Sequence, residues 1–514
     1  MKKNGLPKIN IKEFKDYYYI LTFLILALLL YASIFLLKFE GLRSPDQMDY
    51  AQIARHLYNG DGFITSSINP LSLTFYNSIE NHPNLWRPPL YPLLVSASFH
   101  IFGINDAAVT LVSGFFYILL IPLVYLFAKE MFGRKVGLLA GMISLTSVVL
   151  VDYGMTGLTE TMFTFLFTLS LFLLYKRSNP LFIGFLLGLC YLTRYNLLFI
   201  IPGILWFMYK EYPNWRIDVL KLMAIFMITV SPWWIRNFSL VGNPLFSLQK
   251  YEIVMFNDVF KSYSLYRTFQ PIEPTNFIIS HPISIIKKAI YGAGVLFVGI
   301  PRVIFNFFVP AIAIAGLFDI RREGKNFNFF VSILIMIFLQ ALALAIIHPL
   351  PRLFVPFVPV IITLASYKVV NIIDASRDVN IRRTLIGIFV VLILFPNIAG
   401  IFINDYSRSS YVHEEEIEYI KSIVGQDEAI VTDVPWMVAW YCERTGIWFP
   451  VTYKSMKMNL PSVNYVYFSA REQTGFREQN IKKEYIDNPL FREDFKLIKE
   501  FDSGAVLFKR SQTK

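Results

Sequence analysis

The sequence predicts an α-helical polytopic membrane protein, with about 11 transmembrane helices, in-plane helices in its first outer loop and a small α/β domain at the C-terminus. Three observations support this fold class. Of the 514 residues, 55% are hydrophobic and only 17% are charged, whereas soluble proteins average roughly 25% charged residues. Apolar runs of spanning length recur through the first four-fifths of the chain. Aromatic residues are abundant, with 48 Phe and 29 Tyr, as suits lipid-facing surfaces and interfacial belts.

The transmembrane region is predicted to occupy residues 1–404. Its first apolar run, Tyr17–Leu37, is too long for a signal-peptide core and lacks a small-x-small cleavage site, so we expect an uncleaved span. Several runs are shorter than the roughly 20 residues that a perpendicular span requires, and one helix pair can therefore be merged. The expected spans are 17–37, 108–128, 136–152, 160–175, 180–193, 196–210, 218–235, 303–320, 328–347, 351–371 and 384–404.

The first outer loop, residues 39–107, is predicted to carry helices that do not cross the membrane. Residues 88–103 are apolar, but the apolar core would reach only about 21 Å as a helix, against a hydrocarbon thickness of roughly 30 Å. A helix lying in the outer interface fits this segment better. Residues 284–300, within the second long outer loop (236–302), are a further candidate for the same arrangement.

Orientation follows from the basic residues, because cytoplasmic loops carry an excess of Lys and Arg. With a cytoplasmic N-terminus in the cell membrane, every predicted inner loop is basic and the C-terminus lies outside. The net charge of +11 therefore reflects topology, and no nucleic-acid partner is expected. The residues concerned are Lys129, Arg134, Lys135, Lys176, Arg177, Lys210, Arg216, Lys221, Arg321, Arg322, Lys325, Lys368, Arg377, Arg382 and Arg383.

The remaining residues, 405–514, are predicted to form a small extracytoplasmic α/β domain. Glu414–Ile423 has the spacing of an amphipathic helix, and polar turns separate the apolar or alternating runs that follow it. These runs are Ala429–Thr432, Ile447–Val451, Tyr465–Ser469 and Ala505–Phe508.

Two acids in predicted outer loops are candidates for chemistry. Asp46 follows Ser44-Pro45 at the start of a helical segment, and Glu160 precedes an inward helix. Both positions are typical of helix N-termini, and the residues alone favour a capping role, which Asp49 could share. A carboxylate in an outward polar loop is also suited to general-base chemistry.

Three arginines lie in predicted outer turns, against the positive-inside bias: Arg87, Arg194 and Arg352. One explanation is snorkelling, in which the guanidinium simply reaches the headgroup level. The other is a phosphate site, since guanidinium forms bidentate contacts with phosphate and stabilises the charge of a departing phosphate group.

The first loop resembles the first extracytoplasmic loop of C-type glycosyltransferases that use lipid-phosphate sugar donors. The likeness is carried by SPDQMDYAQIARHLYNGDGF (Ser44–Phe63) and HPNLWRPPLYPLL (His82–Leu94), and it is closest to the protein O-mannosyltransferase and aminoarabinose-transferase families. These families place an Asp-Glu pair before a Tyr-Ala helix. Here Asp46 matches the first acid, Tyr50 begins the Tyr-Ala pair, and Gln47 replaces the second acid.

The resemblance implies a role for each candidate residue. Asp46 would be the catalytic base and Glu160 a second catalytic-site acid facing it. Arg87, just before Pro-Pro, would contact the lipid phosphate. Arg194 stands where relatives often have Lys. Arg352 resembles the basic residue of a late Arg-Tyr-x-x-x-Pro pattern in these families, with Leu353 in place of the Tyr. The other predicted substrate-binding residues are Asp49, Tyr50 and His82.

The function predicted from the resemblance is transfer of one hexosyl or pentosyl group, with inversion, from a polyprenyl-phosphate-linked donor. The acceptor would be a glycan, lipid or protein on the outer face of the membrane. A lipid-linked sugar flippase would also need a polar cavity, but its charges should lie near the midplane of broken helices. A non-catalytic membrane scaffold is the other alternative. No cofactor is predicted, and a divalent metal is unsupported, since the 6 histidines show no metal-binding spacing.

Overall fold

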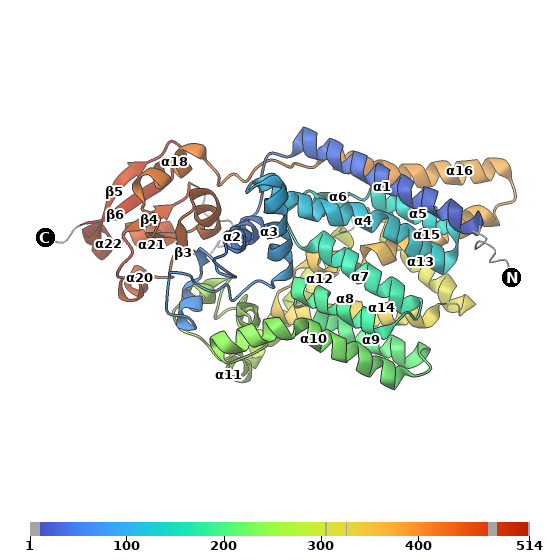
Figure 1. Cartoon of the computed structure of the whole chain (residues 1–514), viewed down its shortest axis with the longest axis horizontal. Helices are drawn as coiled ribbons and strands as arrows, with labels where there is room; N and C mark the ends of the chain where they lie inside the picture. The colour runs from blue at the N-terminus through green and yellow to red at the C-terminus, as the bar shows by residue number, and fades with distance from the viewer. Residues whose placement is uncertain (1–10, 304–305, 325, 471–480, 512–514) are drawn as a thin grey trace, which may run out of the picture.

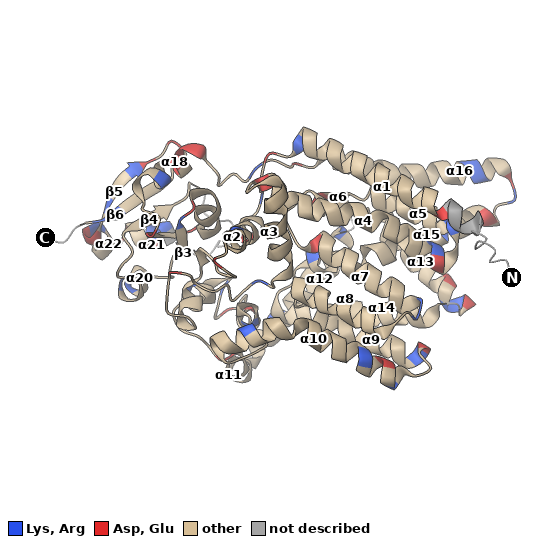
Figure 2. Ribbon diagram, viewed as in Figure 1, with Lys and Arg blue, Asp and Glu red and all other residues tan. Residues whose placement is uncertain are grey.

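The computed structural model describes residues 11–303, 306–324, 326–470 and 481–511. A long helical bundle carries a smaller α/β domain at one end (Figure 1). We call the bundle end that meets this domain the domain end, and the opposite one the far end. Helix α1 runs from the far end to the domain end (Figure 1). Apart from the site described below, the helices between the two ends carry few charged residues (Figure 2).

The helices of the bundle follow the apolar runs of the sequence. Helices α7 and α8 have the predicted bounds, and the others differ from them by a few residues. The bundle helices are α1 (Ile11–Lys38), α4 (Asp106–Phe132), α5 (Arg134–Leu145), α6 (Val148–Gly154), α7 (Glu160–Tyr175), α8 (Pro180–Thr193), α9 (Leu197–Glu211), α10 (Trp215–Val241), α12 (Pro282–Val303), α13 (Phe308–Glu323), α14 (Phe327–Ile347), η4 (Pro351–Phe357), α15 (Val358–Ala375), α16 (Val379–Phe389), the π-helical turn η5 (Val390–Leu394) and α17 (Phe395–Ile403).

The number of membrane crossings is not fixed by these lengths. Within the described residues, 7 helices are long and apolar enough to cross a membrane, or up to 8 if the bent pair α5 and α6 forms one span. Helices α7 and α8, with 16 and 14 residues, are shorter than that. The chain is therefore a multi-pass membrane protein, and a total of eleven spans stays a prediction.

Helix α12 is the main addition to the predicted set. The sequence suggested an interfacial segment at 284–300, whereas the structure has one helix of 22 residues that meets the criteria for a span. Gly292 packs on the backbone of Ala345, near the domain end of α14, and Gly299 packs against Pro351 of η4. Both contacts lie near the turn that joins α14 to η4, so α12 helps to position that turn.

Loops at the domain end carry short elements that bound the site. In the first loop these are α2 (Pro45–Asn59), β1 (Ser67–Ile68), η1 (Pro70–Thr74) and α3 (Leu90–Phe102). Helix α3 is the predicted short apolar helix, and with 13 residues it is too short to cross a bilayer alone. The second long loop contains η2 (Leu248–Ile253), η3 (Ser264–Arg267) and α11 (Pro274–Ser280).

The C-terminal domain contains the predicted helix and strands together with elements that the sequence did not reveal. It comprises α18 (Glu414–Ile423), β2 (Ala429–Thr432), α19 (Pro435–Met437), the π-helical turn η6 (Val438–Cys442), β3 (Thr445–Trp448), α20 (Tyr453–Asn459), β4 (Tyr465–Phe468), α21 (Ile481–Ile486), α22 (Pro489–Asp494), β5 (Phe495–Glu500) and β6 (Val506–Arg510).

One sheet joins the first loop to this domain. Its strand order is β1-β3-β2-β4-β6-β5. Strands β1, β3, β2 and β4 are parallel to one another, and β6 is antiparallel to both of its neighbours, β4 and β5. Strand β1 belongs to the first loop and pairs Ser67 with Gly446 of β3. Consequently the carboxyl ends of β2 and β3 face the segment that follows Ser67, and the C-terminal domain closes over the first loop.

Side chains of the bundle and of the first loop fix this docking. Asp106, at the start of α4, accepts hydrogen bonds from Nε1 of Trp440 and from the hydroxyl of Tyr441, each at 2.7 Å. Nη1 of Arg55, on α2, donates to the carbonyl of Trp440 at 2.8 Å. Three polar contacts on one short turn hold the domain against both α2 and α4.

Candidate active site

Asp46 lies in the first turn of α2, where Ser44 in extended conformation and Pro45 begin the helix. Its carboxylate nevertheless points away from the helix end. Oδ1 accepts a hydrogen bond from Nη2 of Arg87, and Oδ2 accepts one from Nη2 of Arg352, both at 2.7 Å. Asp46 therefore joins two arginines that are more than 250 positions apart in the chain.

Gln47 explains how the helix begins without using Asp46. Its Oε1 accepts hydrogen bonds from the backbone N–H of Arg43 at 2.5 Å and of Ser44 at 3.2 Å. The residue that replaces the second acid of the family thus has a structural role, reaching back to the N-terminal backbone as the third residue of a capping box does.

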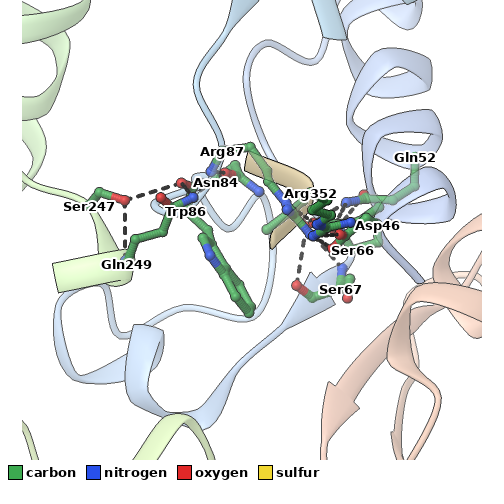
Figure 3. A network of polar contacts seen from close by, with 12 residues as sticks. Asp46, Gln52, Ser66, Ser67, Asn84, Trp86, Arg87, Ser247, Gln249 and Arg352 are labelled. Carbon is green, nitrogen blue, oxygen red and sulfur yellow. Dashed lines mark hydrogen bonds and ion pairs between the residues drawn. The ribbon is translucent and has the colours of Figure 1, made fainter. Parts of the chain in front are cut away.

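The backbone of the first loop positions Arg87 through Asn84. The side-chain oxygen of Asn84 accepts hydrogen bonds from the N–H groups of Trp86 and Arg87, at 3.0 and 2.8 Å (Figure 3). Nε of Arg87 then donates to Oδ2 of Asp49 at 2.6 Å, and its guanidinium carbon lies 4.9 Å from the ring centroid of Tyr50. The guanidinium is held on three sides.

Glu160 begins α7 and is only 2% exposed. Nη1 of Arg194, at the end of α8, lies 2.8 Å from its Oε1 and also donates to the hydroxyl of Thr159 at 3.0 Å. Nε of Arg352 lies 3.7 Å from the same Oε1. Neither carboxylate oxygen of Glu160 accepts a hydrogen bond from a described residue, so this buried acid keeps acceptor capacity.

The structure thus brings the predicted charged residues into one network. Three carboxylates alternate with three guanidinium groups, so their charges balance, as buried ionic groups require. The order of contact is Asp49, Arg87, Asp46, Arg352, Glu160, Arg194.

The pairing gives the two aspartates opposite properties. Burial raises the pKa of Asp46, but the charges and hydrogen bonds of Arg87 and Arg352 outweigh it and hold that pKa well below its usual range. Burial also raises the pKa of Asp49, and there the single guanidinium of Arg87 does not fully offset it. Asp46 is therefore an ionised but weakly basic carboxylate in the unliganded protein.

Two cavities open on opposite sides of this network. The domain cavity has a volume of about 440 Å³, and the helix cavity one of about 320 Å³. Both volumes lie within the range of small-molecule sites. The wall between them consists of the residues that line both: Asp46, Trp86, Arg87, Tyr263 and Arg352.

The helix cavity lies among the domain ends of α8, α9 and α14. Its apolar lining includes Leu198, Phe199, Leu344 and Ile347. Lys250, from η2, also lines it and lies over the rings of Phe246 and Tyr251, at 4.8 and 5.0 Å. The ammonium group of Lys250 forms no ion pair or hydrogen bond with any described residue, unlike the guanidinium groups of the three arginines.

The domain cavity lies between the first loop and the sheet. Polar side chains of the first loop line one side, and Trp436 and Trp448 of the C-terminal domain line the other. His82 is on the polar side, where its Nδ1 and Nε2 lie 2.8 Å from the carbonyl of Ser78 and the hydroxyl of Ser72. Burial lowers the pKa of His82 to about 4, so the ring is neutral at physiological pH.

All eight predicted site residues line or adjoin these cavities, whereas several lining residues were not predicted. Lys250, Glu252, Tyr263 and His348 come from loops without a distinctive spacing. Nδ1 of His348 lies 3.0 Å from Oε2 of Glu252, a pair that joins two loops about 100 positions apart and that no local pattern marks. Among the described residues, no group of three or more His, Cys, Asp or Glu side chains could hold a metal ion.

Comparison with known proteins identifies the fold. Residues 86–235 match the family described as dolichyl-phosphate-mannose-protein mannosyltransferase. No curated protein matches the chain in a sequence comparison. Among solved structures, the chain is similar to the archaeal oligosaccharyltransferase AglB from Archaeoglobus fulgidus, in complex with an inhibitory peptide and a dolichol-phosphate. The TM-score is 0.64 at 13% identity, over 96% of this chain and 74% of that one.

The chain is also similar to ArnT from Cupriavidus metallidurans bound to undecaprenyl phosphate. The TM-score is 0.62 at 12% identity, over 96% of this chain and 98% of that one. The match therefore extends over nearly the whole length of both chains. The resemblance is thereby confirmed at the level of the fold: the chain has the C-type fold that these membrane glycosyltransferases share, and residues 86–235 match the mannosyltransferase family.

Proposed function

We propose that this protein transfers a single sugar from a polyprenyl-phosphate-linked donor to an acceptor on the outer face of the membrane, with inversion at the anomeric carbon. One observation supports the proposal: an ionic network of three acids and three arginines lies between a cavity among helix ends, part of whose wall is apolar, and a second cavity under the sheet. A lipid-linked donor and a separate acceptor need two binding cavities that meet at the residues that catalyse the transfer.

The helix cavity suits the lipid phosphate of the donor. Its apolar walls match a polyprenyl chain, and one edge holds Arg87, Arg194, Arg352 and Lys250. The arginines are already balanced by carboxylates, whereas Lys250 is not, so Lys250 supplies the charge that an incoming phosphodiester requires. Burial lowers the pKa of Lys250, and an anionic phosphate beside it would favour the protonated form.

Transfer then takes place at the shared wall. An acceptor hydroxyl in the domain cavity attacks the anomeric carbon from the face opposite the phosphate. The bond between that carbon and the phosphate oxygen breaks, and Asp46 takes the hydroxyl proton. The leaving polyprenyl phosphate gains one negative charge, which Arg87, Arg352 and Lys250 stabilise.

Donor binding also activates the base. In the unliganded protein, Arg87 and Arg352 hold the pKa of Asp46 well below its usual range, against the effect of burial. A donor phosphate competes for the same guanidinium groups, which weakens their hold on the carboxylate. The pKa of Asp46 consequently rises when the acceptor proton must be accepted, so a single pair of arginines couples donor binding to base strength.

The binding step can be tested by native mass spectrometry of undecaprenyl phosphate with the full-length protein in nanodiscs. We expect Arg87→Ala and Lys250→Ala each to weaken binding by about tenfold or more, the loss of a charge-assisted contact. Lys210→Ala, at the far end, is the matched control. Equal affinity of all four proteins would contradict the assignment of the helix cavity to the donor.

A further inference from the structure

We propose that the domain cavity is a carbohydrate site, and that the acceptor is the hydroxyl of a neutral glycan rather than of a peptide or a lipid headgroup. This inference rests on the proposed function, because it names the acceptor class for the same reaction. Three features of the cavity carry it: its aromatic faces, its unpaired polar groups and the position of its charges.

The aromatic faces come from the carboxyl ends of two adjacent parallel strands. Trp436 follows β2 and Trp448 ends β3, and their ring centroids lie 6.2 Å apart with an interplanar angle of 82°. The two indoles pack edge to face in one corner of the lining, and each is mostly buried, with 7% and 5% of its surface exposed. The C–H face of a sugar ring packs well on the electron-rich face of an indole, which is the part of a Trp that a flat, partly apolar ring can use.

Several polar groups around this corner lack a partner. Nε1 of Trp436 is buried and donates to no described residue. The carboxamide of Asn69 and the hydroxyl of Ser67 line the same cavity and form no side-chain hydrogen bond with a described residue. A ligand with many hydroxyl groups, each both donor and acceptor, can pair with the side chains of Asn69 and Ser67 in this cavity.

The charges lie on one side only. Every charged residue that lines the cavity belongs to the ionic network: Asp46, Asp49, Arg87 and Arg352. The rest of the lining is neutral, and burial holds His82 in its neutral form. An acceptor with a phosphate, carboxylate or ammonium group away from the reacting hydroxyl would find no counter-charge there, which favours an uncharged glycan over a charged headgroup.

The exposed backbone offers little to a peptide. The first-loop edge of the sheet is β1, with only 2 residues, and a peptide that adds to a sheet edge needs a longer run of free backbone groups. Recognition at this cavity therefore depends on side chains. Since the tryptophans belong to the C-terminal domain and Ser67 to the first loop, the shared sheet assembles the site from both.

The test uses full-length protein in nanodiscs on an array of chemically defined neutral oligosaccharides, with peptide and phospholipid arrays beside it. Oligosaccharides that bind are then titrated in solution. We expect Trp436→Ala and Trp448→Ala to weaken binding at least tenfold. Trp436→Phe keeps an aromatic face at this position, so we expect it to lose less affinity than Trp436→Ala. Trp215→Phe, at the far end, is the matched control and should bind like wild type.

Undecaprenyl phosphate binding, measured on the same variants, separates the possible failures. Retained lipid binding shows that a variant is folded. If wild type binds undecaprenyl phosphate but no neutral oligosaccharide, or if peptides or headgroups bind in a Trp436-dependent manner instead, the glycan inference is wrong and the donor assignment stands. If oligosaccharides bind through Trp436 while undecaprenyl phosphate does not bind, the proposed function fails and the carbohydrate site stands.

Discussion

Each carboxylate oxygen of Asp46 accepts a hydrogen bond from a different arginine. Asp46 therefore holds the two arginines in place, in addition to its proposed role as the general base. Replacement by Asn keeps the shape of the side chain and removes the base. We expect Asp46→Asn to lower kcat by 10²–10⁴-fold, the usual contribution of a general base. The rate of sugar transfer by purified protein is the measurement.

Asp61→Asn is the control for that variant, because Asp61 lies in the same loop and forms an exposed pair with His56, of a kind that contributes little to stability. Asp61→Asn should elute and melt like wild type. Asp46→Asn should elute like wild type but melt at a lower temperature, because it leaves Arg87 and Arg352 with one carboxylate fewer. A rate above about half of wild type for Asp46→Asn would mean that the carboxylate only organises the arginines.

Arg87 offers a second test, because an arginine that binds phosphate contributes the planar geometry of its guanidinium group as well as its charge. We expect Arg87→Ala to lower kcat/KM by about 10²–10³-fold, and Arg87→Lys to recover only part of the loss, since ammonium lacks the planar fork that contacts Asp46 and Asp49 together. Rates at several donor concentrations separate binding from turnover. Equal rates for Arg, Lys and Ala would leave only snorkelling as the role of this residue.

The pH dependence of the reaction tests whether the donor activates the base. A lowered pKa keeps Asp46 ionised in the free protein even at acidic pH, so kcat/KM should show no acid limb from Asp46 near the usual Asp pKa of about 4. In the donor complex the pKa of Asp46 is higher, and the acid limb of kcat should lie at higher pH. If the acid limbs of kcat/KM and of kcat lie at the same pH, donor binding does not weaken the pairing of Arg87 and Arg352 with Asp46.

At the scale of elements, close packing of α12 on α14 supports the turn that carries Arg352. A Cβ at Gly292 would lie 2.3 Å from the carbonyl oxygen of Ala345, whereas at Gly294, on the same helix, nothing lies within 4 Å. We expect Gly292→Leu to destabilise the protein by about 1–3 kcal/mol and Gly294→Leu to have little effect. Thermal unfolding in detergent is the measurement, and equal melting of both variants would contradict this packing.

The bounds of many elements could be predicted, because local pattern fixes them. Apolar runs bounded by polar turns predicted α7, α8 and β2 with their observed ends, and amphipathic spacing did the same for α18. Strand β1 could not be predicted: it has 2 residues and exists only because β3, nearly 400 positions later, pairs with it. The break between α5 and α6, bent by 55°, falls at the polar pair Thr146-Ser147, which the predicted span 136–152 passed over.

The charged residues of the site were predicted from the sequence and its other lining residues were not, and the difference has a physical reason. The acids and arginines are recognisable because charge is unusual in outward turns of a membrane protein. The tryptophans, Lys250 and the pair of Glu252 with His348 are ordinary residues in their own segments. They become part of the site only when the second loop and the C-terminal domain fold over the first loop, and no spacing within any one segment encodes that.

At the scale of the whole molecule, the proposal requires that the two ends of the bundle face different compartments. We expect a cysteine at position 61, at the domain end, to react with a membrane-impermeant reagent in intact cells, and cysteines at 135 and 322, at the far end, to react only after permeabilisation. All three positions are exposed, and the natural Cys190 and Cys442 are buried. Labelling at 135 but not at 61 would place the cavities in the cytoplasm.

The central claim is that this protein consumes a polyprenyl-phosphate-linked sugar at the network around Asp46. The most direct measurement follows lipid-linked sugars, extracted from the native cells, by mass spectrometry during incubation with purified protein and native envelope material. We predict that wild type depletes one such lipid and releases the matching polyprenyl phosphate, while Asp46→Asn leaves both unchanged. An identical lipid profile with wild type, with Asp46→Asn and with no protein would contradict the account.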